Sequence, residues 1–175
     1  MYTPEWFLDQ NRLGKMFYAC NQAAATVTLI NTSTATGFIL SNPLGSGKKL
    51  VLKDAMFAYT TVPIATAILF LAQSIAPHTT SVTHTTPLAV YSADGSGAST
   101  VSVARADAAA TTPNLPVYSR ILGYSPTTPA TTGALSFKDE VNGAMILVPG
   151  TYAQISYITT APVGITYMAW AEVDD

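Results

Sequence analysis

Short segments in which apolar and polar residues alternate dominate this chain and indicate β-strands. Such runs, rich in β-branched and aromatic residues, cover residues 16–22, 26–31, 36–42, 48–62 and 65–73. Three more follow late in the chain, at residues 144–150, 151–160 and 164–173. Clusters of Pro, Gly, Asn and Asp separate the runs, and no helical segment alternates with them. The pattern predicts an all-β fold, a jelly-roll-like antiparallel β-sandwich of about eight strands.

The first fifteen residues depart from this pattern and predict a short N-terminal helix or arm, residues 1–15. Thr3 suits an N-cap, Pro4 the first helical position and Gly14 the C-terminal end. Because consecutive apolar residues cannot all share one helix face, a free arm would leave at least one in water. The arm therefore either folds back on its own sandwich or binds a neighbouring chain, and the weight of aromatic residues at interfaces favours the neighbour. The candidate interface residues are Tyr2, Trp6, Phe7, Leu8 and Leu13.

Residues 16–175 form a single β-sandwich domain in this prediction, but the strand pattern weakens between about residues 78 and 133. This stretch is rich in Thr, Ala and Pro and has only short apolar groups, which predicts a long loop region. Disorder is an alternative for parts of it, above all residues 108–112. The apolar residues between 117 and 124 would hold its centre in place.

The composition favours association. Charged residues make up only 10% of the 175 residues and the net charge is −2, whereas soluble domains average about 25% charged residues. Such a surface has little electrostatic self-repulsion, and with 49% hydrophobic residues we expect neighbours to cover part of it. The alternative is a monomer with a hydroxyl-rich β-surface. The chain has no basic block for nucleic acid, no apolar run that could span a membrane and no export pattern in its first residues.

Two motifs that would indicate an enzyme fail on spacing or context. The stretch NPLGSGKK, residues 42–49, resembles a P-loop, but Asn42 occupies the place of the first Gly and Lys49 that of the hydroxyl residue. We predict a turn between two strands that binds no nucleotide. The histidines, His78 and His84, have no Cys, Asp or Glu near them in sequence to complete a zinc site.

The remaining reactive residues form no catalytic pattern either. Asp139 and Glu140 precede Asn-Gly and are interpreted as a turn before the strand at 144–150. The serines lack a nucleophile's sequence context, and the single cysteine, Cys20, is predicted to be a core thiol. We therefore predict that the protein is not an enzyme and has no catalytic residue, cofactor or metal. A small β-sandwich hydrolase is the remaining enzymatic alternative.

Five stretches form a recognisable combination: TGFILSNPLGSGKKLVL, SVTHTTPLAVYS, ARADAAATTPNLPVYSRILG, ILVPGTYAQISYITTAP and AWAEV. Together, from about Thr26 to Val173, they resemble a poorly characterised family of small virion structural proteins of tailed bacteriophages and prophages. The resemblance implies a structural protein, most similar to head decoration (cement) proteins, and it brings no catalytic residues. The residues before Thr26 are not covered.

Decoration proteins bind the outer surface of an assembled head and bridge its capsomers. The resemblance therefore implies two partners, the major capsid protein and further copies of this chain, with a trimer favoured and a dimer second. It implies a place on the outer capsid surface of a virion, after synthesis in the host cytoplasm, with no nucleic-acid or membrane partner. The alternative is a receptor- or carbohydrate-binding β-sandwich of a phage fibre or tail, which would expose Tyr91, Tyr118 and Tyr124 as its binding surface.

Overall fold

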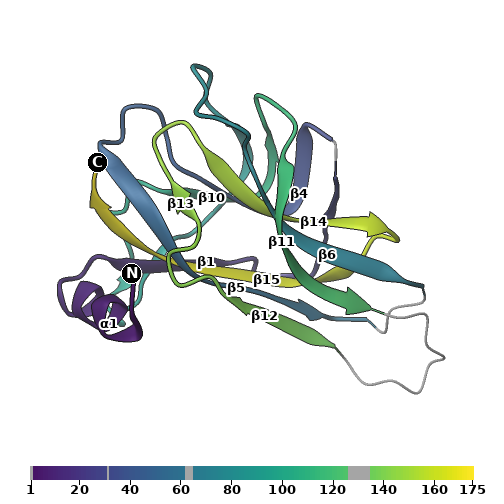
Figure 1. The fold of residues 1–175 in the computed structure, drawn as a ribbon, viewed down its shortest axis with the longest axis horizontal. Coiled ribbons are helices and arrows are strands. Elements are labelled where there is room, and N and C mark those ends of the chain that lie inside the picture. The colour runs from purple at the N-terminus through teal and green to yellow at the C-terminus, as the bar shows by residue number, and fades with distance from the viewer. Residues whose placement is uncertain (1, 31, 62–64, 126–134) are drawn as a thin grey trace.

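The computed structural model describes residues 2–30, 32–61, 65–125 and 135–175, which form one helix and fifteen strands. The strands lie in two sheets that pack face to face, so the predicted all-β sandwich is confirmed (Figure 1). Sheet A contains β1 (Met16–Cys20), β2 (Ala25–Thr26), β5 (Lys48–Tyr59), β8 (Tyr91–Ser92), β9 (Gly97–Ala98), β12 (Ser136–Glu140), β13 (Ile146–Leu147) and β15 (Val163–Asp174). Sheet B contains β3 (Thr28–Leu29), β4 (Thr34–Ser41), β6 (Ala67–Gln73), β7 (Thr83–Leu88), β10 (Arg105–Thr111), β11 (Val117–Ser125) and β14 (Tyr152–Thr159).

Eight principal strands give the sandwich a jelly-roll topology. In sheet A they follow the order β12-β5-β15-β1, and in sheet B the order β11-β6-β14-β4. Along the chain each principal strand lies in the sheet opposite to the one before it, except that β11 pairs with β6 in sheet B. Two interleaved Greek keys of this kind define a jelly roll.

Two of the principal strands lie where the sequence predicted a loop and a turn. β11 falls in the expected loop region, and Asp139 and Glu140 belong to β12 rather than to a turn. The turn comes next, at Asn142 and Gly143, which both have positive φ. Conversely, the runs at 26–31 and 144–150 contribute only short strands of two residues. Because β11 and β12 are edge strands with many exposed positions, they lack the dense apolar alternation by which central strands are recognised.

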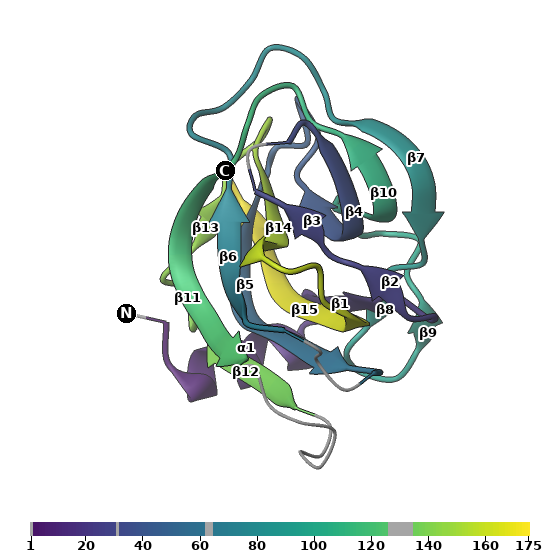
Figure 2. The ribbon, with the colours of Figure 1, turned by 90° about the vertical axis from the view of Figure 1, so that its right-hand side faces the viewer.

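The expected long loop region also contains an insertion of four strands between β6 and β11. β10 and β7 extend sheet B beyond β4, and β8 and β9 extend sheet A beyond β1. Figure 2 shows these added strands on the side of the molecule opposite to β11 and β12. Most of residues 108–112, where disorder was an alternative, lie in β10. Alanine has a low β-propensity, so the run ARADAAAT gave no strand signal although Ala106 and Ala110 are buried.

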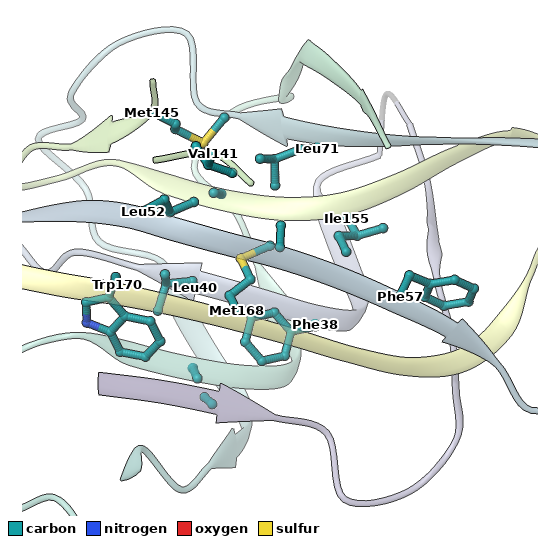
Figure 3. Close-up of a cluster of buried hydrophobic side chains, with 14 of the residues drawn as sticks. Phe38, Leu40, Leu52, Phe57, Leu71, Val141, Met145, Ile155, Met168 and Trp170 are labelled. Atoms are coloured by element: carbon teal, nitrogen blue, oxygen red, sulfur yellow. The ribbon is translucent and has the colours of Figure 1, made fainter. Parts of the chain in front are cut away.

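The core lies between the two sheets. β5 and β15 are the longest strands, and they pair with each other from Lys48 opposite Asp174 to Tyr59 opposite Gly164. Alternate residues of both strands point inward, with a bulge in β5 between Leu52 and Asp54, and Trp170 is fully buried among them. Figure 3 shows part of this core, in which sheets A and B and the β12–β13 connection contribute Phe38, Leu40, Leu52, Phe57, Leu71, Val141, Met145, Ile155, Met168 and Trp170.

The stretch that resembles a P-loop is a turn that joins β4 to β5, as predicted. Asn42 is buried, and its side-chain amide donates to the carbonyl oxygens of Lys48 (2.7 Å) and Leu147 (2.8 Å). Its Oδ1 accepts a hydrogen bond from the Ser46 hydroxyl (2.7 Å). No helix follows this turn to hold a phosphate, because β5 begins at Lys48. Asn42 therefore fixes the turn and ties it to β13.

Replacing Asn42 by Ala should lower the free energy of unfolding by about 1–3 kcal/mol, because buried carbonyl groups then lose their donor. Urea unfolding followed by tryptophan fluorescence measures the change. The exposed Thr100→Ala variant is the control and should stay within about 0.5 kcal/mol of the wild type. An Asn42→Ala midpoint equal to that of the wild type would contradict this role.

Candidate functional site

The predicted N-terminal helix is present as α1, which begins at Pro4 and ends at Arg12. The backbone N–H of Trp6 donates to Oγ1 of Thr3 (3.2 Å), so Thr3 is the N-cap that the sequence indicated. Gly14 follows the helix with φ +68°, a left-handed conformation that ends helices.

Helix α1 packs on the outer face of sheet A of its own chain (Figure 1). Phe7 is only 1% exposed and lies in a small apolar cluster with Met16, Val51 and Ala171. Tyr2 extends the contact to the β12–β13 turn, where a Cβ on Gly143 would overlap the tyrosine ring. The expectation that the arm binds a neighbour rather than its own sandwich is therefore wrong for Phe7, since burial of this large ring within the chain leaves it inaccessible to a partner.

The other candidate interface residues differ in accessibility. Tyr2 and Trp6 are partly buried and pack edge to face, with ring centroids 4.5 Å apart. Leu8 and Leu13 are exposed, and Leu8 also borders a cavity between α1 and sheet A that Met16 and Tyr167 line. The place of these four residues in an interface stays a prediction, and the two leucines are the more exposed of the four.

A larger apolar surface lies on the outer face of sheet B, where none of the candidate interface residues for the capsid lies, although Tyr118 and Tyr124 of the receptor-binding alternative do. It is formed by one row of side chains on each of three neighbouring strands, β11, β6 and β14. Ile121 is 70% exposed and Tyr124 is 55% exposed. The neighbouring outward residues of β6 and β14, such as Ala72 and Ser156, are uncharged. We call this surface the β11 face: Ile68, Phe70, Tyr118, Ile121, Tyr124 and Ile158.

Two bulges in β11 create the β11 face. The pairing of β11 with β6 shifts between Tyr118 and Arg120 and again between Ile121 and Gly123. Each shift adds a residue, so side chains three positions apart, Tyr118, Ile121 and Tyr124, come to lie beside the outward row of β6. Tyr118 consequently stacks on Phe70 at 4.1 Å between ring centroids. A search for period-two alternation could not detect this surface, because the bulges change the period to three.

Contacts between the edge strands of the two sheets hold β11 in place. Arg120 of β11 donates to both carboxylate oxygens of Asp139 of β12, at 2.5 and 2.9 Å. The hydrogen bonds raise the pKa of Arg120 above its ordinary value. Beside them, Gly123 lies so close to the ring of Phe137 that a Cβ would overlap it. The β11 face therefore stands on a rigid strand, as a binding surface requires.

The two histidines have different environments. The backbone N–H of His78 donates to the carbonyl of Gly150, whereas Nδ1 of His84 lies 2.5 Å from Oδ2 of Asp107. Sequence reasoning missed this acidic partner because it is 23 residues away and is brought close by the pairing of β7 with β10. The described residues contain no group of three or more His, Cys, Asp or Glu side chains that could hold a metal. Nor does the described part of the chain contain a helix long and apolar enough to cross a membrane.

The three tyrosines proposed as a receptor-binding surface are not together. Tyr118 and Tyr124 lie on β11 of sheet B, but Tyr91 lies on β8 of sheet A. Its ring stacks on Tyr18 at 5.5 Å, and Tyr18 also packs against Tyr167 at 5.8 Å. Tyr91 therefore belongs to a row of tyrosines that crosses β15, β1 and β8, on the opposite side of the sandwich from the β11 face.

This row of tyrosines should make stability depend on pH under alkaline conditions. Burial, assisted by the nearby Asp54 carboxylate, raises the pKa of Tyr167 to about 12. The folded state thus favours the neutral phenol, and this contribution is present below the ordinary tyrosine pKa near 10 and is lost as the pH rises through about 12. Urea unfolding between pH 9 and 12 should show a smaller loss of stability for Tyr167→Phe than for the wild type. Parallel curves for the two proteins would contradict the assignment.

Comparisons of this chain with protein-family models, with curated proteins and with solved structures found no match.

Proposed function

We propose that this protein is a virion structural protein, a decoration (cement) protein that binds the outer surface of an assembled phage head and bridges its capsomers. The observation that carries the proposal is the β11 face, a rigid and uncharged apolar surface that nothing within the described residues covers. Contiguous exposed apolar patches mark sites of protein interaction. The sequence resemblance to phage structural proteins supplies the partner, the major capsid protein.

The physical properties of the β11 face suit attachment to a protein surface. Aromatic anchors such as Tyr118 and Tyr124 dominate interface energetics, and Ile121 lies between them on β11. Complete burial of one such side chain contributes about 1.5–3 kcal/mol. Because the face carries no charge, a partner can cover it without removing water from an ion. The jelly-roll fold supports the proposal only by analogy, since capsid proteins and lectins both use it.

Two other apolar patches on the outer faces of the sandwich are covered by the chain itself. On sheet A, the outward side chains of Val51 and Ala171 are already buried under α1. On sheet B, a second apolar patch lies over β4 and β14 and includes the outward side chains of Ile39 and Tyr152. Val82, in the segment between β6 and β7, packs against this patch. None of the described residues covers the face on β11, β6 and β14 in this way, and it is the surface that we assign to the capsid.

A charge placed between Tyr118 and Tyr124 on the β11 face should abolish attachment. We expect Ile121→Asp to weaken binding to heads that lack the protein by at least about a hundredfold, since a carboxylate would be buried without a partner. Co-sedimentation with purified heads measures the binding. Val101→Asp is a matched control, because Val101 is 71% exposed but lies in the insertion between β6 and β11; it should bind normally.

The same assay separates this surface from the helix. Leu13→Asp should leave attachment unchanged if the β11 face is the binding surface. Loss of attachment with Leu13→Asp, and not with Ile121→Asp, would move the interface to α1. Labelling of tails or fibres rather than heads by a specific antibody in electron micrographs would favour the receptor-binding alternative instead.

Copies of the protein are proposed to associate with one another, as a trimer first and as a dimer second. Because the net charge is low, electrostatic repulsion between copies is weak. A trimer also matches the local three-fold axes of a shell. Sedimentation equilibrium should find the trimer in solution, or a map of the virion should find it at the three-fold positions. A monomeric footprint on the particle would contradict this proposal.

A further inference from the structure

Two cavities meet at the edge of the sandwich where β7 pairs with β10, far from the β11 face. Their volumes are about 380 and 360 Å³, a size that accepts a small ligand. Both are lined by His84 and Arg105, so these two side chains form the boundary between them. Figure 2 shows β7 and β10 on one side of the molecule and β11 on the other. This site is independent of the proposed attachment to a head.

Arg105 gives the cavities a positive charge without a carboxylate partner. Among the described residues, Arg12 pairs with Asp9 and Arg120 with Asp139, whereas Arg105 forms no ion pair. It is exposed at the start of β10, with Ala106 pointing into the core behind it. A free guanidinium in a cavity is suited to bind a carboxylate through two parallel hydrogen bonds.

His84 and Asp107 add acceptors beside this charge. Asp107 is fully buried, and its Oδ2 accepts the hydrogen bond from Nδ1 of His84. This pairing leaves Nε2 of His84 free to form a hydrogen bond with a ligand hydroxyl, as the acceptor when the ring is neutral and as the donor when the ring is protonated. The other carboxylate oxygen, Oδ1 of Asp107, is buried and has no hydrogen-bond partner among the described residues. A buried acceptor without a donor costs stability that a bound donor restores.

The remaining lining suits a molecule with one apolar side. Pro87, Leu88 and Val90 also line the first cavity, with Pro87 paired to Asp107 across the two strands, and Ser81 adds a hydroxyl to the second. Cation, acceptors, hydroxyl and apolar wall are together the complement of a sugar that carries a carboxylate. We propose that these cavities bind an acidic saccharide, with the carboxylate on Arg105, sugar hydroxyls on His84 and the Asp107 carboxylate, and the C–H face of the ring against the Pro87 wall.

Binding of D-glucuronate, D-glucose and acetate to the full chain tests the proposal, by NMR titration of backbone amides. D-glucuronate should bind at least about tenfold more tightly than either of the other probes, because only it has both the carboxylate and the hydroxyls. Arg105→Gln should reduce its affinity to that of D-glucose. His84→Gln should weaken both sugars while acetate binds as before. Arg12→Gln, on the exposed surface of α1, is the control and should bind as the wild type does.

The proposal is overturned by three outcomes: no shift of amides near β7 and β10 with D-glucuronate, equal affinity for D-glucuronate and D-glucose, or full binding by Arg105→Gln. Acetate binding as tight as that of D-glucuronate would show an anion site without sugar recognition and would also overturn it. Amide spectra of the free variants establish that each is folded. Head attachment through Ile121 is measured separately, so either proposal can fail without the other.

Discussion

The antiparallel pairing of β5 with β15 is the interaction on which the rest of this structure depends. These two strands are the central strands of sheet A and form much of its inner face. β12 pairs with the free edge of β5, and β1 pairs with the free edge of β15. β15 also reaches the inserted strands through Glu172. This buried carboxylate accepts hydrogen bonds from the Ser102 hydroxyl and from the backbone N–H groups of Val103 and Ala104. A single strand thereby fixes both the jelly roll and the insertion before β10.

The two outer faces of the sandwich differ in how far the described residues cover them. On sheet A, α1 buries Phe7 against Val51 and Ala171, so this face adds to the stability of the chain itself. On sheet B, Ile121 and Tyr124 remain exposed although each is large enough to join a core. Apolar surface left on a rigid strand lowers solubility, and a partner that covers the surface removes this cost. The division favours a protein that folds alone and then attaches to a larger assembly.

The central strands could be predicted from the sequence because the alternation of their residues shows which side faces the core. The segments 48–62 and 164–173 carry inward residues at every second position, apart from one bulge in β5 between Leu52 and Asp54, and they became β5 and β15. The helix was predictable from local chemistry, since Thr3 and Pro4 act within their own turn. The packing of the helix could not be predicted, because Phe7 packs against residues such as Val51 and Ala171, which are more than forty positions away from it in the sequence.

The candidate sites were harder to predict for the same reason. The β11 face requires two bulges, which depend on the partner strand and have no local signature. Likewise, the pairing of His84 with Asp107 exists only because β7 lies beside β10. Local sequence patterns record the preferences of a strand, whereas the register between strands is decided by the whole sheet.

The position of β15 between β1 and β5 has a consequence for synthesis. The ribosome makes β1 and β5 early, but the strand that joins them is made well over a hundred residues after β1. Until β15 is made, β1 and β5 are not joined in one sheet, and the core around Leu50 and Leu52 of β5 is incomplete. The edges of β1 and β5 that later pair with β15 are then open to pairing with other chains. Such distant pairing makes folding slow, so chaperones that shield nascent strands should determine how much of this protein reaches its native state.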